Sequence, residues 1–246
     1  MLFRSLGVGV RHAVTAEVRR IFGLDFDLPA FYRFAKMDPV LAELVGPLHG
    51  LRPTLAPTGL EMLVGSITAQ QVNLAFAFAC RARLVRRYGT PLACDGETVY
   101  AFPSATALAR ARIAGLRTMQ FSTRKAEYVR DVARAIAAGT LDLPALRQAP
   151  NARVIEILTA VRGFGRWTAE WYLARYLGRG DICPAGDLGV RRAFERYYGR
   201  GRSLSEETVR RRARAWGEQR NLAVHYLLTG MRLGLAGADG NAWIRS

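Results

Sequence analysis

Apolar residues recur at helical spacing along most of the chain. The clearest example is the segment 59–69, in which apolar positions lie three or four residues apart and predict an amphipathic helix. Thr58, followed by Glu61 three residues later, has the spacing of a capping box and marks where this helix begins. The same pattern predicts helices at 14–21, 28–35, 39–48, 74–88, 105–111, 122–138, 151–161, 167–177 and 222–233.

The segments between the predicted helices are short and rich in turn-forming residues. The segment 89–103 contains proline and glycine and is predicted to be a loop. Ser203, with Glu206 three residues later, has a second capping-box spacing and predicts the start of a further helix. Because no segment shows a convincing alternation of strands, we expect an all-α fold.

The stretch 154–177 joins two predicted helices through a very short turn. The apolar stripe of the first helix stops before Gly163, Phe164 and Gly165, which are too few for a loop, and a second helical pattern opens at Arg166. Glycine on both sides of Phe164 lets the backbone take positive φ and lets another chain come very close. Since the first turn of the second helix leaves N–H groups without partners in the helix, such a turn suits a phosphate group.

The second helix of this pair has two apolar faces. At 100° per residue, Ala169, Leu173 and Tyr176 fall on one side, and Trp167, Trp171 and Ala174 fall on roughly the opposite side. We expect the first face to pack on the core and the two indoles to line a pocket. A helix that is buried all round is the alternative interpretation.

The composition favours a globular protein with a polyanionic partner. Half of the 246 residues are hydrophobic, and the formal net charge is +16. Of the 36 basic residues only Lys36 and Lys125 are lysines, so 34 are arginines. Base composition of the gene can explain the choice of arginine over lysine, but it does not explain 36 basic residues against 20 acidic ones.

Cysteine usage and hydropathy exclude several classes. Cys80, Cys94 and Cys183 are widely separated and form no CxxC or Cys/His cluster, so neither a disulfide framework nor a zinc site is indicated. The apolar runs are far shorter than the roughly 18 residues of a membrane span. No cleavage site of small residues follows the short apolar stretch at 1–10. We expect a cytoplasmic protein that does not enter a membrane.

Two segments together resemble the helix-hairpin-helix DNA glycosylase superfamily: LTAVRGFGRWTA at 158–169 and PAGDLGV at 184–190. The spacing of twenty residues from Trp167 to Asp187, and a predicted helix that ends in Gln70 and Gln71, are similar to the 3-methyladenine DNA glycosylase II branch. A lone glycine hairpin would be weak support, whereas this combination is specific. The likeness covers about 25–235.

The resemblance implies a helical glycosylase domain over about 25–240, with two lobes, a cleft between them and the hairpin at about 154–177. Residues 1–24 would then be a short N-terminal segment. They are too few to build the β-rich N-terminal domain that relatives carry, so we expect that domain to be absent or vestigial.

The resemblance also assigns a catalytic carboxylate to Asp187. In glycosidic cleavage, such a carboxylate stabilises an oxocarbenium-like sugar and orients or deprotonates the attacking water. Aspartate is also among the best N-caps, and Val190 begins a helical repeat just after it, so Asp187 is equally expected to cap a helix. The two roles are compatible. Glu170, the nearest other acid, is expected at an exposed helix position.

By the same resemblance, Trp167 and Trp171 are the base-pocket residues, with core packing as their alternative. Relatives supply a further aromatic residue from the last long helix, and the nearest position in this sequence is Leu228. Gln71 takes the position of the residue that plugs the duplex, although two adjacent glutamines could also be ordinary solvated surface. The residues implied in DNA binding are Gly163, Gly165, Arg166, Thr168, Gln70 and Gln71.

Relatives hold a monovalent cation, Na+ or K+, on hairpin carbonyls, here those of Thr159, Val161 and Phe164. An iron–sulfur cluster, as in the endonuclease III branch, would need four clustered cysteines, which this sequence lacks. Bifunctional members of the superfamily use a lysine just after the hairpin as nucleophile, and that position here is Trp167. The sequence therefore predicts a monofunctional glycosylase with no other cofactor.

The predicted substrate is an alkylated purine such as 3-methyladenine or 7-methylguanine. A base alkylated on a ring nitrogen already carries positive charge and leaves without a strong acid, and indole faces attract cations. The alternatives are a glycosylase for uracil, hypoxanthine or an oxidised base, and a helix-hairpin-helix protein that binds DNA without catalysis. The expected partner is damaged double-stranded DNA, bound by a monomer at the bacterial nucleoid.

Overall fold

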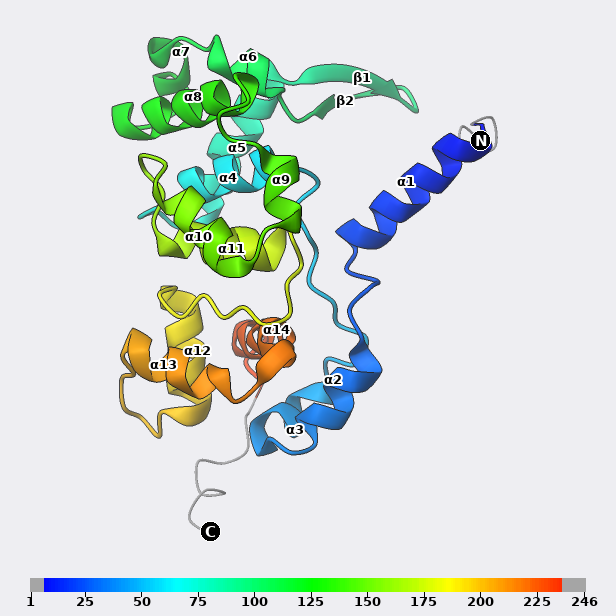
Figure 1. Ribbon diagram of the computed structural model, residues 1–246, viewed down its shortest axis with the longest axis vertical. Coiled ribbons are helices and arrows are strands. Elements are labelled where there is room, and N and C mark those ends of the chain that lie inside the picture. Colours follow the sequence, from blue (N-terminus) through cyan, green and yellow to red (C-terminus); the bar gives the residue numbers. More distant parts are fainter. Residues whose placement is uncertain (1–6, 236–246) are drawn as a thin grey trace. The chain divides into compact units, whose positions relative to one another are not determined.

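The computed structural model describes residues 7–235, which form fourteen α-helices and one β-hairpin (Figure 1). The chain divides into two compact units. Unit 1 consists of Met1–Pro57 and Leu173–Ser246, and unit 2 consists of Thr58–Tyr172. Unit 2 is therefore an insertion between the two parts of unit 1. The all-α prediction is confirmed except for the hairpin, and no β-rich domain precedes the helices within the described residues.

Unit 1 packs helices from both ends of the chain around one core. The C-terminal helix α14 contacts both α3 and α12, and α2 packs on α3. Phe31, Leu44, Phe194 and Tyr226 are completely buried between these helices. The bounds are α1 (Val8–Ile21), α2 (Leu28–Ala35), α3 (Pro39–Val45), α12 (Leu188–Tyr198), α13 (Glu206–Arg214) and α14 (Arg220–Arg232), with a 3-10 turn at Gly217–Gln219.

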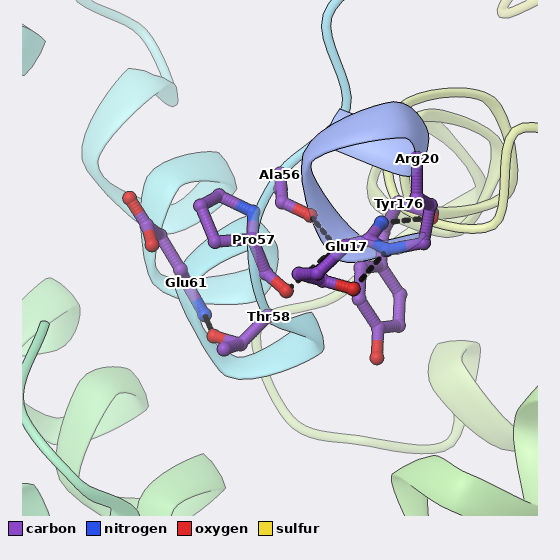
Figure 2. A network of polar contacts seen from close by, with 7 residues as sticks. All are labelled: Glu17, Arg20, Ala56, Pro57, Thr58, Glu61 and Tyr176. Carbon is purple, nitrogen blue, oxygen red and sulfur yellow. Dashed lines mark hydrogen bonds and ion pairs between the residues drawn. The ribbon is translucent and has the colours of Figure 1, made fainter. Parts of the chain in front are cut away.

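Arg20, near the end of α1, ties together the two chain segments that lead to and from unit 2 (Figure 2). Its guanidinium donates to the carbonyls of Ala56 and Pro57, at 3.0 and 2.8 Å, and to the carbonyl of Tyr176 at 3.3 Å. The carboxylate of Glu17 accepts from the same side chain and raises the pKa of Arg20. Because a guanidinium presents several donors in a fixed plane, one side chain serves three carbonyls.

Unit 2 is built around α8, which packs on α4, α6 and α7. Helix α4 begins where the capping box predicts, because the Thr58 hydroxyl accepts from the backbone N–H of Glu61 at 3.1 Å (Figure 2). The bounds are α4 (Gly59–Ala69), α5 (Leu74–Tyr88), β1 (Thr90–Cys94), β2 (Glu97–Ala101), α6 (Ala105–Ala109), α7 (Ile113–Arg117), α8 (Thr123–Ala137), α9 (Leu143–Gln148) and α10 (Asn151–Thr159). Helix α11 (Arg166–Arg175) begins in unit 2 and ends in unit 1.

The prediction of a loop over 89–103 is wrong. Strands β1 and β2 pair antiparallel, with Leu92 opposite Val99, and the hairpin extends away from the helices of unit 2 in Figure 1. Asp95 and Gly96 close it with positive φ angles of 48° and 82°, the conformation that Asp-Gly favours in two-residue hairpins. This turn signal lies in the sequence, but every strand residue is exposed, so no buried stripe accompanies it.

Two helix starts also differ from the prediction. Helix α13 begins two residues later than the Ser203 capping box indicates, because Ser205 is the residue whose hydroxyl accepts from the N–H of Thr208. Helix α1 begins at Val8 instead of position 14. The predicted domain end near 240 lies outside the described residues.

Candidate active site

The segment between α10 and α11 forms the predicted tight hairpin. The N–H of Phe164 donates to the carbonyl of Val161 at 3.0 Å, and the carbonyl of Gly165 accepts the first helical bond of α11, from Ala169, at 3.2 Å. Phe164 is buried, whereas the two glycines beside it are more exposed. The hairpin is thus fixed by an apolar anchor at its centre, with the start of α11 directly after it.

Gly163 is required by the fold. Its φ is +93°, and a Cβ at this position would lie 2.5 Å from ring atoms of Tyr128 on α8. Arg162 lies over the same ring, with its guanidinium carbon 5.4 Å from the ring centroid, and donates to the carboxylate of Glu127 at 2.8 Å. Helix α8 therefore holds this arm of the hairpin through ring contact and an ion pair.

Gly165 differs from Gly163. Its φ is not positive, it is exposed, and a Cβ built on it would meet no atom within 4 Å. Nothing within the described residues therefore requires glycine here. A glycine that the fold does not need, at the N-terminal end of a helix, leaves room for the close approach of an external group.

Glu170 is buried, and the prediction of an exposed position is wrong. Only 4% of its side chain is accessible, and its carboxylate accepts from Nε of Arg166 at 2.8 Å, one helical turn earlier. The Arg166 side chain is itself 55% accessible. Glu170 thus binds the Nε side of the Arg166 guanidinium, while the side chain as a whole stays in contact with solvent.

The burial of α11 agrees in part with the two predicted faces. Trp167 and Trp171 are half-buried and Ala169 is fully buried, but Ala174, predicted on the side of the indoles, is also fully buried. Thr168 is only 1% exposed as a whole residue, backbone included. Leu173, on the same face as Ala169, is fully buried in unit 1. The indoles are therefore the accessible apolar groups beside the hairpin on this helix.

Gln70 and Gln71, which end α4, have different environments. Gln71 is exposed and has a φ of +55°, a left-handed conformation that is unfavourable for a residue with a side chain. The side-chain amide of Gln70 donates to the carbonyl of Gly163 at 2.9 Å. Gln71 is presented to solvent, while Gln70 is used inside unit 2.

Lys125 is a residue whose role sequence reasoning missed. Its ammonium donates to the carbonyls of Thr68 and Gln70, at 3.0 and 2.6 Å, and burial lowers its pKa. The composition does contain a signal for this residue, because only two of the 36 basic residues are lysines. A compact ammonium can serve two nearby carbonyls at the end of a helix.

Asp187 is the N-cap of α12, as predicted. Its Oδ1 accepts from the N–H of Val190 at 3.0 Å, and its own N–H donates to the carbonyl of Pro184 at 2.9 Å. A Cβ at Gly189 would lie 3.0 Å from Asp187 Oδ1 and 3.6 Å from Leu228. Leu228 therefore lies near Asp187 within unit 1, and the capping bond fixes the carboxylate at the start of the helix.

The segment that leads to Asp187 is bound to the start of α14. Asn221 donates through its amide to the carbonyls of Ala174 and Arg179, both at 3.0 Å, and through its backbone N–H to Gly180. Arg220 donates to the carbonyl of Asp181 at 2.8 Å. Since Asn221 is 1% exposed, these bonds form in a dry environment, where they constrain the chain strongly.

The structure thus joins Gln70 directly to Gly163 and collects Arg166, Trp167 and Trp171 on α11, all in unit 2. Asp187 belongs to unit 1.

No group of three or more His, Cys, Asp or Glu side chains suited to a metal occurs among residues 7–235. The predicted monovalent cation would instead use carbonyls. The carbonyl of Val161 already accepts from Phe164 and retains a second lone pair, which fits that prediction without testing it.

The sequence model of the HhH-GPD superfamily of base excision DNA repair proteins matches residues 64–219. This match spans well over half of the chain and includes both the hairpin and Asp187. The chain belongs to the HhH-GPD superfamily. It is therefore a DNA glycosylase of base excision repair, and the resemblance found in its sequence is confirmed.

Two proteins that are similar over most of this chain have names that refer to 3-methyladenine. The Bacillus subtilis DNA-3-methyladenine glycosylase is 29% identical over 217 residues, which are 88% of this chain and 72% of that protein. The structure of the Archaeoglobus fulgidus 3-methyladenine DNA glycosylase matches with a TM-score of 0.83 and 31% identity, covering 93% of this chain and 77% of that one.

A third protein of similar fold has a different activity in its name. The Clostridium acetobutylicum 8-oxoguanine glycosylase/lyase, solved in complex with double-stranded DNA, matches with a TM-score of 0.79 and 21% identity, covering 88% of this chain and 73% of that one. At this identity the likeness shows the fold alone.

None of the helices in the described part of this chain is both long and apolar enough to cross a membrane.

The two hairpin glycines should respond differently to alanine. Gly163→Ala should lower the free energy of unfolding by roughly 1–3 kcal/mol, because the new methyl group meets the Tyr128 ring at positive φ. Gly165→Ala should change stability by less than about 0.5 kcal/mol, yet weaken binding to damaged and undamaged duplex alike. Thermal unfolding and fluorescence anisotropy measure the two effects. Undiminished duplex binding by Gly165→Ala would contradict a phosphate contact there.

Proposed function

We propose that this HhH-GPD protein is a monofunctional glycosylase that hydrolyses the N-glycosidic bond of alkylated, cationic purines such as 3-methyladenine and 7-methylguanine. One observation carries the proposal: beside the hairpin, α11 presents two half-buried indoles and has Trp167 at the position of the nucleophilic lysine in bifunctional relatives. The names of the B. subtilis and A. fulgidus proteins support the same substrate class.

In the proposed mechanism, the start of α11 and the hairpin hold the DNA backbone. The N-terminal end of a helix attracts phosphate through its N–H groups and its dipole, and Gly165 leaves space for close approach. The exposed guanidinium of Arg166 adds a positive charge at the same point. These contacts offset the few kcal/mol that flipping a nucleotide out of the duplex costs, and Gln71 fills the gap left behind.

The carboxylate of Asp187 acts on the sugar. As the bond between C1′ and the base nitrogen breaks, its electron pair leaves with the base, and the sugar gains positive charge that a nearby carboxylate stabilises. Water then attacks C1′, and its proton passes to the carboxylate. Because the alkylated base is cationic before the bond breaks, it departs as a neutral molecule and needs no protonation by a general acid.

Trp167 and Trp171 recognise the flipped base. An indole face attracts a cation by roughly 0.5–2 kcal/mol, depending on how far the pair is desolvated, and this attraction distinguishes an alkylated purine from a normal one. Leu228, near Asp187, leaves the apolar surroundings of the carboxylate less aromatic than in relatives. All the groups invoked belong to one chain, so we propose that the protein acts as a monomer on damaged double-stranded DNA.

The absence of lyase activity follows from the positions of the lysines. Lys36 is exposed at the end of α2, and Lys125 donates to two backbone carbonyls of unit 2. Neither follows the hairpin. We therefore propose that the product is an uncut abasic site. The proposed cation, Na+ or K+ on the carbonyls of Thr159, Val161 and Phe164, would support the hairpin and take no part in the chemistry.

Replacing Asp187 with Asn should reduce base release about a hundredfold or more, because only the carboxylate stabilises the charge in the transition state. Asparagine is as good an N-cap as aspartate, so α12 and the melting temperature should be preserved. Asp142→Asn is the matched control, since Asp142 caps α9 in the same way. Single-turnover release from methylated duplex measures the rates. A folded Asp187→Asn protein with the parent rate would remove the catalytic assignment.

Borohydride added during turnover should trap no covalent protein–DNA adduct, because no lysine is expected to form a Schiff base with the sugar. Denaturing electrophoresis of labelled duplex detects both an adduct and strand cleavage. A bifunctional 8-oxoguanine glycosylase/lyase is the positive control. A trapped adduct that disappears in Lys125→Met or Lys36→Met would overturn the monofunctional assignment.

The wild-type protein should release 3-methyladenine and 7-methylguanine much faster than uracil, hypoxanthine or 8-oxoguanine. Trp167→Ala should slow release of the cationic bases by an amount equivalent to roughly 1–3 kcal/mol, since stacking and cation attraction are both lost. Neutral bases should be affected less. Chromatography of the freed bases measures these rates. Preference of the parent protein for a neutral lesion, or equal slowing of both classes in Trp167→Ala, would refute the proposed substrate class.

A further inference from the structure

Two elements that the proposed function brings against DNA, the hairpin at Gly163 and the exposed Gln71, share one support within unit 2. That support is α8. Lys125 and Tyr128 lie one helical turn apart on it, so they project from the same face. Lys125 contacts the end of α4, and Tyr128 lies against Gly163.

The contact at Lys125 fixes the backbone on both sides of the end of α4. Its ammonium donates to the carbonyl of Thr68, inside the helix, and to that of Gln70, which is the C-cap residue. The last carbonyls of a helix have no partner within it, and a cation there also complements the helix dipole. The Gln70 carbonyl belongs to the peptide bond that joins Gln70 to Gln71. Lys125 therefore acts directly before the residue with the left-handed conformation.

The contact at Gln70 joins this turn to the hairpin. Its side-chain amide donates to the carbonyl of Gly163 at 2.9 Å, across 93 residues of sequence. The same glycine rests against the Tyr128 ring. A closed chain of contacts therefore runs from Lys125 through Gln70 and Gly163 to Tyr128 and returns along α8.

Gln71 needs such support because of its conformation. Its φ of +55° is rarely adopted by residues with a side chain, and strained backbone of this kind persists only where the surroundings impose it. The strain lies at a residue that is exposed and contributes nothing to the core.

We propose that Lys125 and Gln70 are positioning residues: they hold Gln71 in its left-handed conformation at a fixed place relative to the hairpin, so that its side chain enters the gap left by a flipped nucleotide. This inference rests on the proposed function in one respect, that Gln71 is the plug. Neither residue touches the reacting atoms. The effect of Lys125, whose ammonium donates to the end of α4, should appear in the insertion step and leave the phosphate contacts unchanged.

The test follows plug insertion without any base release. The probe is a duplex that contains a tetrahydrofuran abasic analogue opposite 2-aminopurine, whose fluorescence responds when a side chain enters the gap. The Lys125→Met and Gln70→Met proteins keep the side-chain length and lose the donors. Lys125→Arg is the conservative variant, and Lys36→Met is the matched control because it removes the other lysine at an exposed position.

Lys125→Met and Gln70→Met should each lower the equilibrium constant for insertion about tenfold, since small misplacements of a positioned group have effects of this size. Lys125→Arg should restore most of the response, and Lys36→Met should match the parent. Anisotropy with undamaged duplex should change by less than about twofold in the Lys125 and Lys36 variants, because they leave the hairpin contacts in place. Melting curves identify any variant that is unfolded.

A double-mutant cycle decides between positioning and simple stabilisation. If Lys125 acts through Gln71, adding Lys125→Met to Gln71→Ala should cause no further loss. Multiplicative losses, or a full insertion response from folded Lys125→Met, would overturn the proposal. A parent protein with no fluorescence response would overturn it as well, because Gln71 would then not be a plug. Normal insertion without release of alkylated bases would refute the lesion class alone.

Discussion

The hairpin of unit 2 can close only because position 163 has no side chain. The Tyr128 ring occupies the space that a Cβ would need, and the backbone there takes a φ of +93°. The Gly163 carbonyl accepts from the side chain of Gln70, and α11 begins three residues after this glycine. The base pocket and the phosphate site that we propose on α11 therefore follow directly on one close approach between a glycine and an aromatic ring.

Unit 1 uses a different principle to place its carboxylate. Asp187 is constrained by the cap of α12, and the segment before it is bound by Asn221 and Arg220 at the start of α14. A capping carboxylate lies at the positive end of a helix dipole, which stabilises its negative charge. In the mechanism that we propose, structural and chemical roles are combined in one side chain, and the sequence supports both interpretations of Asp187 for this reason.

Much of the fold could be predicted from the sequence, because helical periodicity and capping residues are local signals. The ends of α2, α4 and α5 were placed correctly in this way, and Asp187 was correctly expected as an N-cap. The hairpin β1–β2 was missed because its residues are all exposed and no buried alternation marks it.

Roles that arise from contacts distant in sequence could not be found in this way. Glu170 was expected to be exposed, because its burial depends on how α11 packs and not on spacing. Lys125 and Tyr128 were read as ordinary residues of a helix, since their partners lie near positions 70 and 163. The pattern that indicated the family includes the hairpin and Gln70, but neither Lys125 nor Tyr128.

The insertion of unit 2 into unit 1 has a consequence for folding. Helices α2 and α3 cannot form the core of unit 1 until α12 and α14 arrive, and about 115 residues of unit 2 separate these two groups. Closing so long a loop as a flexible chain is slow and entropically unfavourable. The N–H of Ala56 donates to the carbonyl of Arg175 at 2.6 Å, so the chain leaves for unit 2 and returns from it at adjacent points. A unit 2 that folds first would bring these points together, and the assembly of unit 1 would then start from a much shorter effective loop.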